Sequence, residues 1–173
     1  WQHPRRGLLP AAEFLPAAEE SGLIIPLGQW ALREACRQVA SWRGQDATGK
    51  PALMVGVNLS TPEFHDANLL PLIAEVLQET GLPPGALILE ITEATLMADT
   101  ERAVATLQQL ALLGVRAAID DFGLTYASMA RLSRFPLAYL QIGRRFVDNL
   151  STDLDATVMV SGMIGLAHAL RQG

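Results

Sequence analysis

Two adjacent carboxylates follow a short apolar run in the middle of the chain. Residues 116–119 lead directly into Asp120 and Asp121, which Phe122 and Gly123 follow. Such a run predicts a buried strand that delivers both acids to one end of a sheet. Two neighbouring carboxylates repel each other unless a cation lies between them. The other interpretation is a strand followed by an ordinary solvated turn, and the Asp-Asp pair by itself does not decide between the two.

Two further apolar runs also end in a residue that can bind a metal. Residues 53–57 precede Asn58, and residues 86–89 precede Glu90. These polar ends lie 32 residues apart (58 to 90), and the Asp-Asp pair begins 30 residues later, which is about the length of one strand-helix unit. Strands that alternate with amphipathic helices pair in parallel and end at the same edge of the sheet. We therefore expect the four polar residues to converge there as oxygen ligands of a hard cation such as Mg²⁺ or Mn²⁺.

Apolar stripes with helical spacing separate these strands, and a fourth apolar run follows them. Ser60 with Glu63 three residues later forms a capping box, which predicts a helix start after the first strand. The alternation predicts an α/β fold, and we expect residues 1–173 to form a single domain. The expected elements are helices over 10–20, 27–42, 69–80, 101–113, 126–132 and 155–171, and a further strand over 137–142.

The composition limits the partners and the compartment. The 173 residues carry a net charge of −5 and one lysine, Lys50, without a basic run, so a nucleic-acid duplex is not an expected partner. Cys36 is the only cysteine, which excludes an intrachain disulfide and fits a small buried side chain in a reducing compartment. The apolar stretch 158–170 is too short for a membrane span. We expect a cytoplasmic location, with any membrane anchor in another part of a longer protein.

Three ordered motifs resemble the EAL domain family, whose members hydrolyse the bacterial second messenger cyclic di-GMP. They are Val-Asn-Leu-Ser at 57–60, Glu-Ile-Thr-Glu at 90–93 and Asp-Asp-Phe-Gly at 120–123. Residues 1–4 resemble the segment just after the family's Glu-Ala-Leu motif, so the resemblance runs along the whole chain. It implies a (β/α)8 barrel of the TIM type, which needs about 250 residues. We therefore expect a partial barrel that lacks its first and last strands.

The resemblance also implies roles for the polar strand ends. Asn58 and Glu90 correspond to metal ligands, and Asp120 and Asp121 to the pair that shares two metal ions, with Asp121 also catalytic. Two ions, Mg²⁺ or Mn²⁺, would activate a water and stabilise the leaving oxygen of a phosphodiester. Glu93 corresponds to the glutamate that stabilises the loop after the Asp-Asp pair. Its alternative role is that of an acid stabilised by the dipole of a helix N-terminus.

Two segments depart from the family's pattern. Where the family has Leu-Lys-Ile-Asp in the strand after the Asp-Asp loop, this chain has Gln141 and Gly143 in place of the lysine and the aspartate. Lys50 lies before the first of the three strands, at the opposite edge of the sheet, and is a poor substitute. The loop after the Asp-Asp pair is altered at 124–127 and lacks the family's second glycine, which restricts its backbone.

The remaining polar residues have simpler interpretations. Arg144 and Arg145 either replace part of the lost lysine charge or form a solvated pair just past the strand. His3, His65 and His168 share no metal-ligand spacing, and His168 lies in an apolar helix, where packing is its simpler role.

Three functions are consistent with the sequence. The first is a degenerate EAL module that binds cyclic di-GMP or a protein partner with little or no hydrolysis, which Gln141 and the altered 124–127 loop favour. The second is an active metal-dependent phosphodiesterase that releases the linear dinucleotide, and the third is a structural or dimerisation module. Open sheet edges would be covered by further chain, by a second copy in a homodimer or by an exchanged segment. Fused regulatory domains outside this chain are also expected partners.

Overall fold

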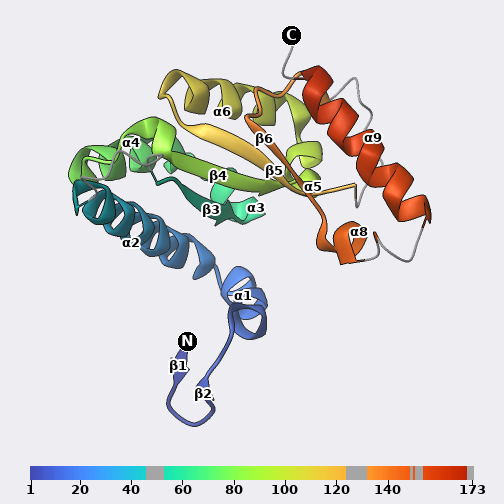
Figure 1. Ribbon diagram of the computed structural model, residues 1–173. Coiled ribbons are helices and arrows are strands. Elements are labelled where there is room, and N and C mark those ends of the chain that lie inside the picture. The colour runs from blue at the N-terminus through green and yellow to red at the C-terminus, as the bar shows by residue number, and fades with distance from the viewer. Residues whose placement is uncertain (46–52, 124–131, 149, 151–153, 171–173) are drawn as a thin grey trace.

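The computed structural model describes residues 1–45, 53–123, 132–148, 150 and 154–170 (Figure 1). At its centre is a parallel sheet in which each strand pairs with the next one along the chain, in the order β3-β4-β5-β6. All C-terminal strand ends therefore lie at one edge, as the strand-helix alternation predicts. The strands are β3 (Val55–Leu59), β4 (Leu87–Thr92), β5 (Arg116–Phe122) and β6 (Tyr139–Ile142).

Long helices accompany the strands. Helix α2 (Ile24–Gln45) packs against β3 and against α4 (Leu69–Thr80), which connects β3 to β4. Helix α6 (Thr100–Leu112) contacts β5, and α9 (Leu154–Leu170) contacts β6. Figure 1 shows α2 and α9 at opposite sides of the sheet. None of the helices in the described residues is long and apolar enough to cross a membrane.

Burial alternates along β4 and distinguishes the two faces of the sheet. Leu87, Leu89 and Ile91 are fully buried, whereas Ile88 and Glu90 between them are half-buried. Successive side chains of a strand point to opposite faces, so one face packs into the helices and the other face is more open. The open face is the one that carries Glu90.

The core lies between the covered face of the sheet and the helices. It joins buried side chains from α2, α4, β5 and α6, including Cys36, Ile73, Ile119 and Leu107. Small and branched apolar residues fill it, as the low aromatic content of 6% indicates.

Short elements begin and connect these units. The N-terminal hairpin of β1 (Gln2–His3) and β2 (Gly7–Leu8) leads into α1 (Ala11–Glu20), and Figure 1 shows this part projecting away from the sheet. Three short helices begin at or directly after the C-terminal ends of strands β3, β4 and β6. They are α3 (Thr61–Phe64), α5 (Glu93–Ala98) and α8 (Arg144–Asp148), while the 3-10 turn η1 (Pro84–Ala86) precedes β4.

The predicted long elements are present with shifted ends. Helix α2 is longer than the predicted 27–42, and β6 is shorter than the predicted 137–142. The predicted capping box is present, with the Ser60 backbone N–H donating to Glu63 Oε2 at 2.9 Å. The hairpin and α8 were not predicted, because elements of two to five residues show no periodicity. Lys50, the 124–127 loop and all but the last residue of the predicted 126–132 helix lie outside the described residues.

Candidate functional site

The polar strand ends stand side by side on the open face. Asn58 of β3 lies opposite Glu90 of β4, and Thr92 of β4 lies opposite Asp120 of β5. Opposite residues of a parallel pair point to the same face, as do residues two apart in one strand. Asn58, Glu90 and Asp120 therefore share this face near the C-terminal ends of adjacent strands, which is the placement that the sequence predicts.

A bulge in β5 contains both acids of the Asp-Asp pair. Between two paired positions, β5 contains Asp120 and Asp121 where β6 contains Gln141 alone. A bulge of this kind bends the strand and re-aims its side chains. Asp121 has a φ of 51°, a left-handed conformation that Asp tolerates better than most residues. Its backbone N–H donates to Asp120 Oδ1 at 2.8 Å.

Gln141 binds Glu90 across the intervening strand. The Gln141 side-chain amide nitrogen, Nε2, donates a hydrogen bond to Glu90 Oε1 at 2.7 Å. Ala118 of β5 lies opposite Glu90, and its methyl group leaves room for the two longer side chains to meet above it. Hydrogen bonds to an ionised acceptor are stronger than those between neutral groups. The contact therefore restrains the Glu90 carboxylate.

The carboxylates of Glu90 and Asp121 have different neighbours. A Cβ at Gly56, on β3, would lie 2.2 Å from Glu90 Oε1. A Cβ at Gly143, just after β6, would lie 3.6 Å from Asp121 Oδ1. Glu90 Oε1 therefore lies between Gly56 of β3 and the side-chain amide of Gln141 of β6, whereas Asp121 Oδ1 lies beside the residue that follows β6.

Two side chains form hydrogen bonds with Gly123, the first residue after β5. Glu93, at the start of α5 and 2% exposed, accepts a hydrogen bond at Oε2 from the Gly123 backbone N–H at 3.3 Å. Arg145 donates from Nη2 to the Gly123 carbonyl oxygen at 2.8 Å, and its guanidinium lies 4.5 Å from the centre of the Phe146 ring. Glu93 thus contacts the first residue after β5, which is compatible with a role in stabilising the loop. It also occupies the first turn of α5, which is compatible with stabilisation by the helix dipole.

Comparison with known proteins identifies the family. A sequence model of the EAL domain matches residues 1–172. The chain belongs to the EAL domain family. EAL domains are (β/α)8 barrels of the TIM type, and the parallel sheet described above is part of such a barrel, which confirms the α/β fold class.

Several bacterial proteins are similar to this EAL chain along its length. An uncharacterized signaling protein of Caulobacter vibrioides is 44% identical over 170 residues. The bifunctional diguanylate cyclase/cyclic di-GMP phosphodiesterase MucR of Pseudomonas aeruginosa is 40% identical, and the cyclic di-GMP phosphodiesterase PdeR of Escherichia coli is 36% identical. Each alignment covers 98% of this chain but 20%, 24% and 25% of the relatives, so the chain spans a quarter of their length or less.

Solved EAL structures share the fold closely. The MucR phosphodiesterase in complex with cyclic di-GMP has a TM-score of 0.92 and 40% identity, over 99% of this chain and 68% of that one. The FimX EAL domain from Pseudomonas aeruginosa bound to cyclic di-GMP has a TM-score of 0.84 and 27% identity, over 97% of this chain and 65% of that one.

The polar residues at the strand ends have oxygen atoms of the kind that bind a metal ion, but the structure does not place them around a common point. EAL phosphodiesterases are metal-dependent in general, and carboxylate and amide oxygens suit hard cations. Within the described residues, however, no three Asp, Glu, His or Cys side chains lie close enough to hold an ion. Glu90 is bound by Gln141. As arranged, these residues do not form a metal site, and their roles as ligands stay predictions.

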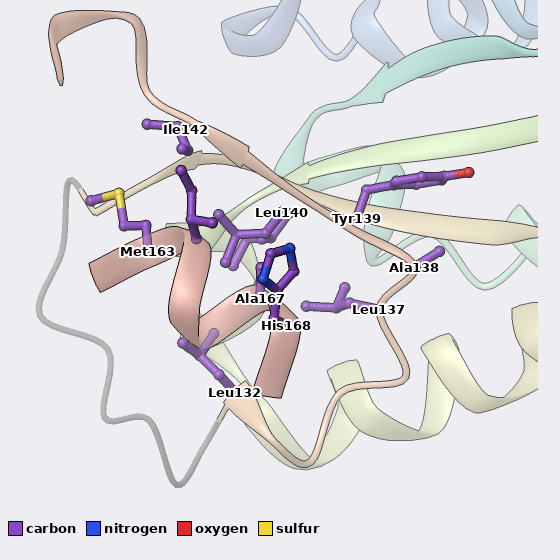
Figure 2. Close-up of a pocket in the computed structure, with 11 residues that line it drawn as sticks. Leu132, Leu137, Ala138, Tyr139, Leu140, Ile142, Met163, Ala167 and His168 are labelled. Atoms are coloured by element: carbon purple, nitrogen blue, oxygen red, sulfur yellow. The ribbon is translucent and has the colours of Figure 1, made fainter. Parts of the chain in front are cut away.

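Two expectations about basic side chains agree with the structure. Arg144 pairs with Asp148, with Nε 3.1 Å from Oδ2 and the arginine side chain 89% exposed, which fits the solvated interpretation. His168 lines an apolar cavity of about 200 Å³ between β6 and α9, together with Leu140 and Met163 (Figure 2). His168 thus packs at the rim of apolar side chains, as expected, although the residue as a whole is exposed.

Sequence reasoning missed the small residues of the open face and the contact of Arg145. Gly56 precedes Asn58 by two residues, and Ala118 precedes Asp120 by two residues. On a strand this spacing places the small residue on the same face as the polar one. The alternation is therefore a signal in the sequence for an uncovered polar face.

Proposed function

We propose that this chain is an EAL module of bacterial cyclic di-GMP signalling that binds cyclic di-GMP, or a protein partner, with little or no hydrolysis. The observation that carries this proposal is the hydrogen bond from Gln141 to Glu90 at 2.7 Å. A neutral amide stands where the family has a lysine, and it engages a carboxylate that a metal would need. We propose residues 1–173 as one partial domain.

Two solved relatives support binding of the dinucleotide. The MucR phosphodiesterase and the FimX EAL domain both hold cyclic di-GMP, and this chain matches them with TM-scores of 0.92 and 0.84. The open face of the sheet offers polar groups at the same edge, including the exposed Asn58. An acidic chain can bind an anionic nucleotide when a cation supplies the positive charge.

The missing lysine charge argues against efficient hydrolysis. Removing one group that stabilises developing charge slows an enzyme by about 10²–10³-fold. Gln141 can donate a hydrogen bond but carries no charge. Neither neighbouring arginine replaces it, because Arg144 pairs with Asp148 and Arg145 donates to the Gly123 carbonyl oxygen.

Mg²⁺ or Mn²⁺ is the proposed cofactor. The proposed donors are the polar residues at the C-terminal strand ends, Asn58, Glu90, Asp120 and Asp121. A bound ion would supply positive charge beside the phosphate. Because Gln141 already binds the Glu90 carboxylate, we expect this chain to bind the ion weakly and to hydrolyse cyclic di-GMP slowly.

The alternative is an active phosphodiesterase that releases the linear dinucleotide. The placement of Asn58, Glu90 and Asp120 on one face near the strand ends favours it. In this alternative Asp121 is the catalytic residue, Glu93 stabilises the loop after it, and Glu90 leaves Gln141 to bind a metal.

The test is a comparison of binding with turnover in the intact protein. Cyclic di-GMP is titrated by calorimetry in Mn²⁺ and in EDTA, and the nucleotide is afterwards separated by chromatography, with PdeR as a positive control. The proposal predicts saturable binding and recovery of the cyclic nucleotide. Conversion at the rate of PdeR would establish the alternative, and the absence of binding would leave a structural or dimerisation module.

Further partners are proposed from the length of the relatives. This chain spans a quarter or less of the three proteins compared above. We therefore propose that the module acts in the cytoplasm within a longer protein, with fused regulatory domains and a second copy of the chain as partners.

A further inference from the structure

The Glu90 carboxylate is displaced from the C-terminal strand ends, where the other polar residues lie. A Cβ added to Gly56 would stand 2.2 Å from Glu90 Oε1 and 2.9 Å from Glu90 Cδ. Gly56 precedes Asn58 by two residues, and Asn58 is the residue opposite Glu90 in the register. Residues two apart in a parallel strand are about 6.6 Å apart along it. The carboxylate therefore leans toward the N-terminal end of the sheet, away from the strand ends.

Three neighbours create this withdrawn position. Gly56 has no side chain where the carboxylate lies, and Ala118 places only a methyl group between Glu90 and Gln141. Tyr139 is the β6 residue level with Glu90, and Gln141 lies two residues further toward the strand ends, beside the Asp-Asp bulge, from where its side chain reaches back to donate the hydrogen bond. Within the described residues, none of the ion pairs involves Glu90. A neutral amide, and not a cation, thus holds the carboxylate.

We propose that Gly56 and Gln141 are positioning residues that hold Glu90 withdrawn and thereby weaken the binding of a divalent cation at the strand ends. The inference rests on the proposed function, because it explains why an EAL site that retains these acids would hydrolyse cyclic di-GMP slowly. A cation at the strand ends has to compete with Gln141 for Glu90.

The test is a Mn²⁺ titration of the intact protein, without nucleotide, by calorimetry. Gln141→Leu removes the donor and keeps most of the volume, whereas Gly56→Ala places a methyl group where the carboxylate now lies. Both changes release Glu90 toward the strand ends. Since partners that orient a metal ligand change metal affinity by about 10–100-fold, each variant is expected to bind Mn²⁺ at least about tenfold more tightly than the wild type.

Two matched variants control for the chemical change itself. Gln109→Leu makes the same substitution at an exposed position of α6. Gly85→Ala adds a methyl group whose nearest neighbour would be 3.9 Å away. Both are expected to leave the Mn²⁺ affinity unchanged.

A second measurement reports the position of Glu90 without a metal. The Gln141 side-chain amide gives a ¹H–¹⁵N signal that is identified by its loss in Gln141→Leu. Gly56→Ala is expected to shift this signal, because the carboxylate leaves the amide, whereas Gly85→Ala is not. A purely structural role for Gly56 would lower stability without moving this signal.

The outcomes separate this inference from the proposed function. An unchanged Mn²⁺ affinity in Gln141→Leu overturns the inference, even when Gly56→Ala fails to fold. Tighter Mn²⁺ binding in Gln141→Leu, with both controls unchanged, supports it. If the wild type does not bind cyclic di-GMP but Gln141→Leu binds Mn²⁺ more tightly, the proposed dinucleotide binding is overturned and this inference stands.

Discussion

At the scale of single residues, the buried acids of this protein fix local structure. Among the described residues, Glu63 and Glu93 are the buried carboxylates. Glu63 accepts from the Ser60 backbone N–H, and Glu93 accepts from the Gly123 backbone N–H. A buried carboxylate is tolerated when hydrogen bonds replace its water. Glu63 thereby starts α3, and Glu93 holds the root of the loop after the Asp-Asp pair.

Replacement of Glu93 by alanine tests this structural role. The change leaves the Gly123 N–H without this acceptor and opens space around a side chain that is 2% exposed. We expect a loss of about 1–3 kcal/mol in the free energy of unfolding, measured by urea denaturation. Glu101→Ala is the matched control, because it breaks an exposed ion pair with Arg134 and should cost less than about 1 kcal/mol. Equal losses in the two variants would contradict this account of Glu93.

At the scale of elements, the end of β5 is fitted tightly against α8 and α9. Gly123 has a φ of 95°, and a Cβ there would lie 2.3 Å from Met163 Cε and 3.0 Å from Phe146 Cε2. Both the backbone conformation and the packing therefore require glycine. The Asp-Asp bulge, the short helix and the long helix meet at this single residue.

A Gly123→Ala variant tests that junction. The left-handed conformation and the overlap with Met163 should together cost at least about 1–3 kcal/mol of unfolding free energy, measured by thermal or urea denaturation. Gly162→Ala is the control, because a Cβ there would have no neighbour within 4 Å. It lies inside α9 and should stabilise the helix by up to about 1 kcal/mol. A fully stable Gly123→Ala protein would show that the junction is looser than described.

The elements also show what sequence can predict. The C-terminal ends of β3, β4 and β5 were predictable to within two residues, because their apolar runs stop at Asn58, Glu90 and Asp120. The register then follows from parallel pairing. The contact between Gln141 and Glu90 was not predictable, because it joins residues 51 positions apart across another strand. It depends on the missing side chain at Gly56 and on the bulge in β5, and the bulge has no periodic signal.

At the scale of the whole molecule, one core connects the helices to the sheet. Cys36 of α2 is fully buried in that core, and burial raises the pKa of its thiol from 9.0 to about 11. Between these two values the unfolded chain has released the thiol proton and the folded protein has kept it. The unfolded state then binds fewer protons, so the free energy of unfolding must fall as the pH rises.

This linkage gives a pH prediction for the intact fold. From about pH 9 to pH 11, Cys36 should lower the free energy of unfolding by up to about 1.4 kcal/mol per pH unit. Urea denaturation across this range measures the slope, and Cys36→Ala, although less stable at neutral pH, should have a shallower one. A thiol that reacts rapidly with Ellman's reagent in the folded protein at pH 8 would contradict the burial on which the prediction rests.

The most direct test of the account is a crystal structure of the intact protein grown with cyclic di-GMP and Mn²⁺. The account predicts an intact cyclic dinucleotide on the open face of the sheet, with Gln141 Nε2 still within hydrogen-bond distance of Glu90 Oε1. A linear dinucleotide, with Glu90 and Asp121 bound to the same metal ion, would contradict it.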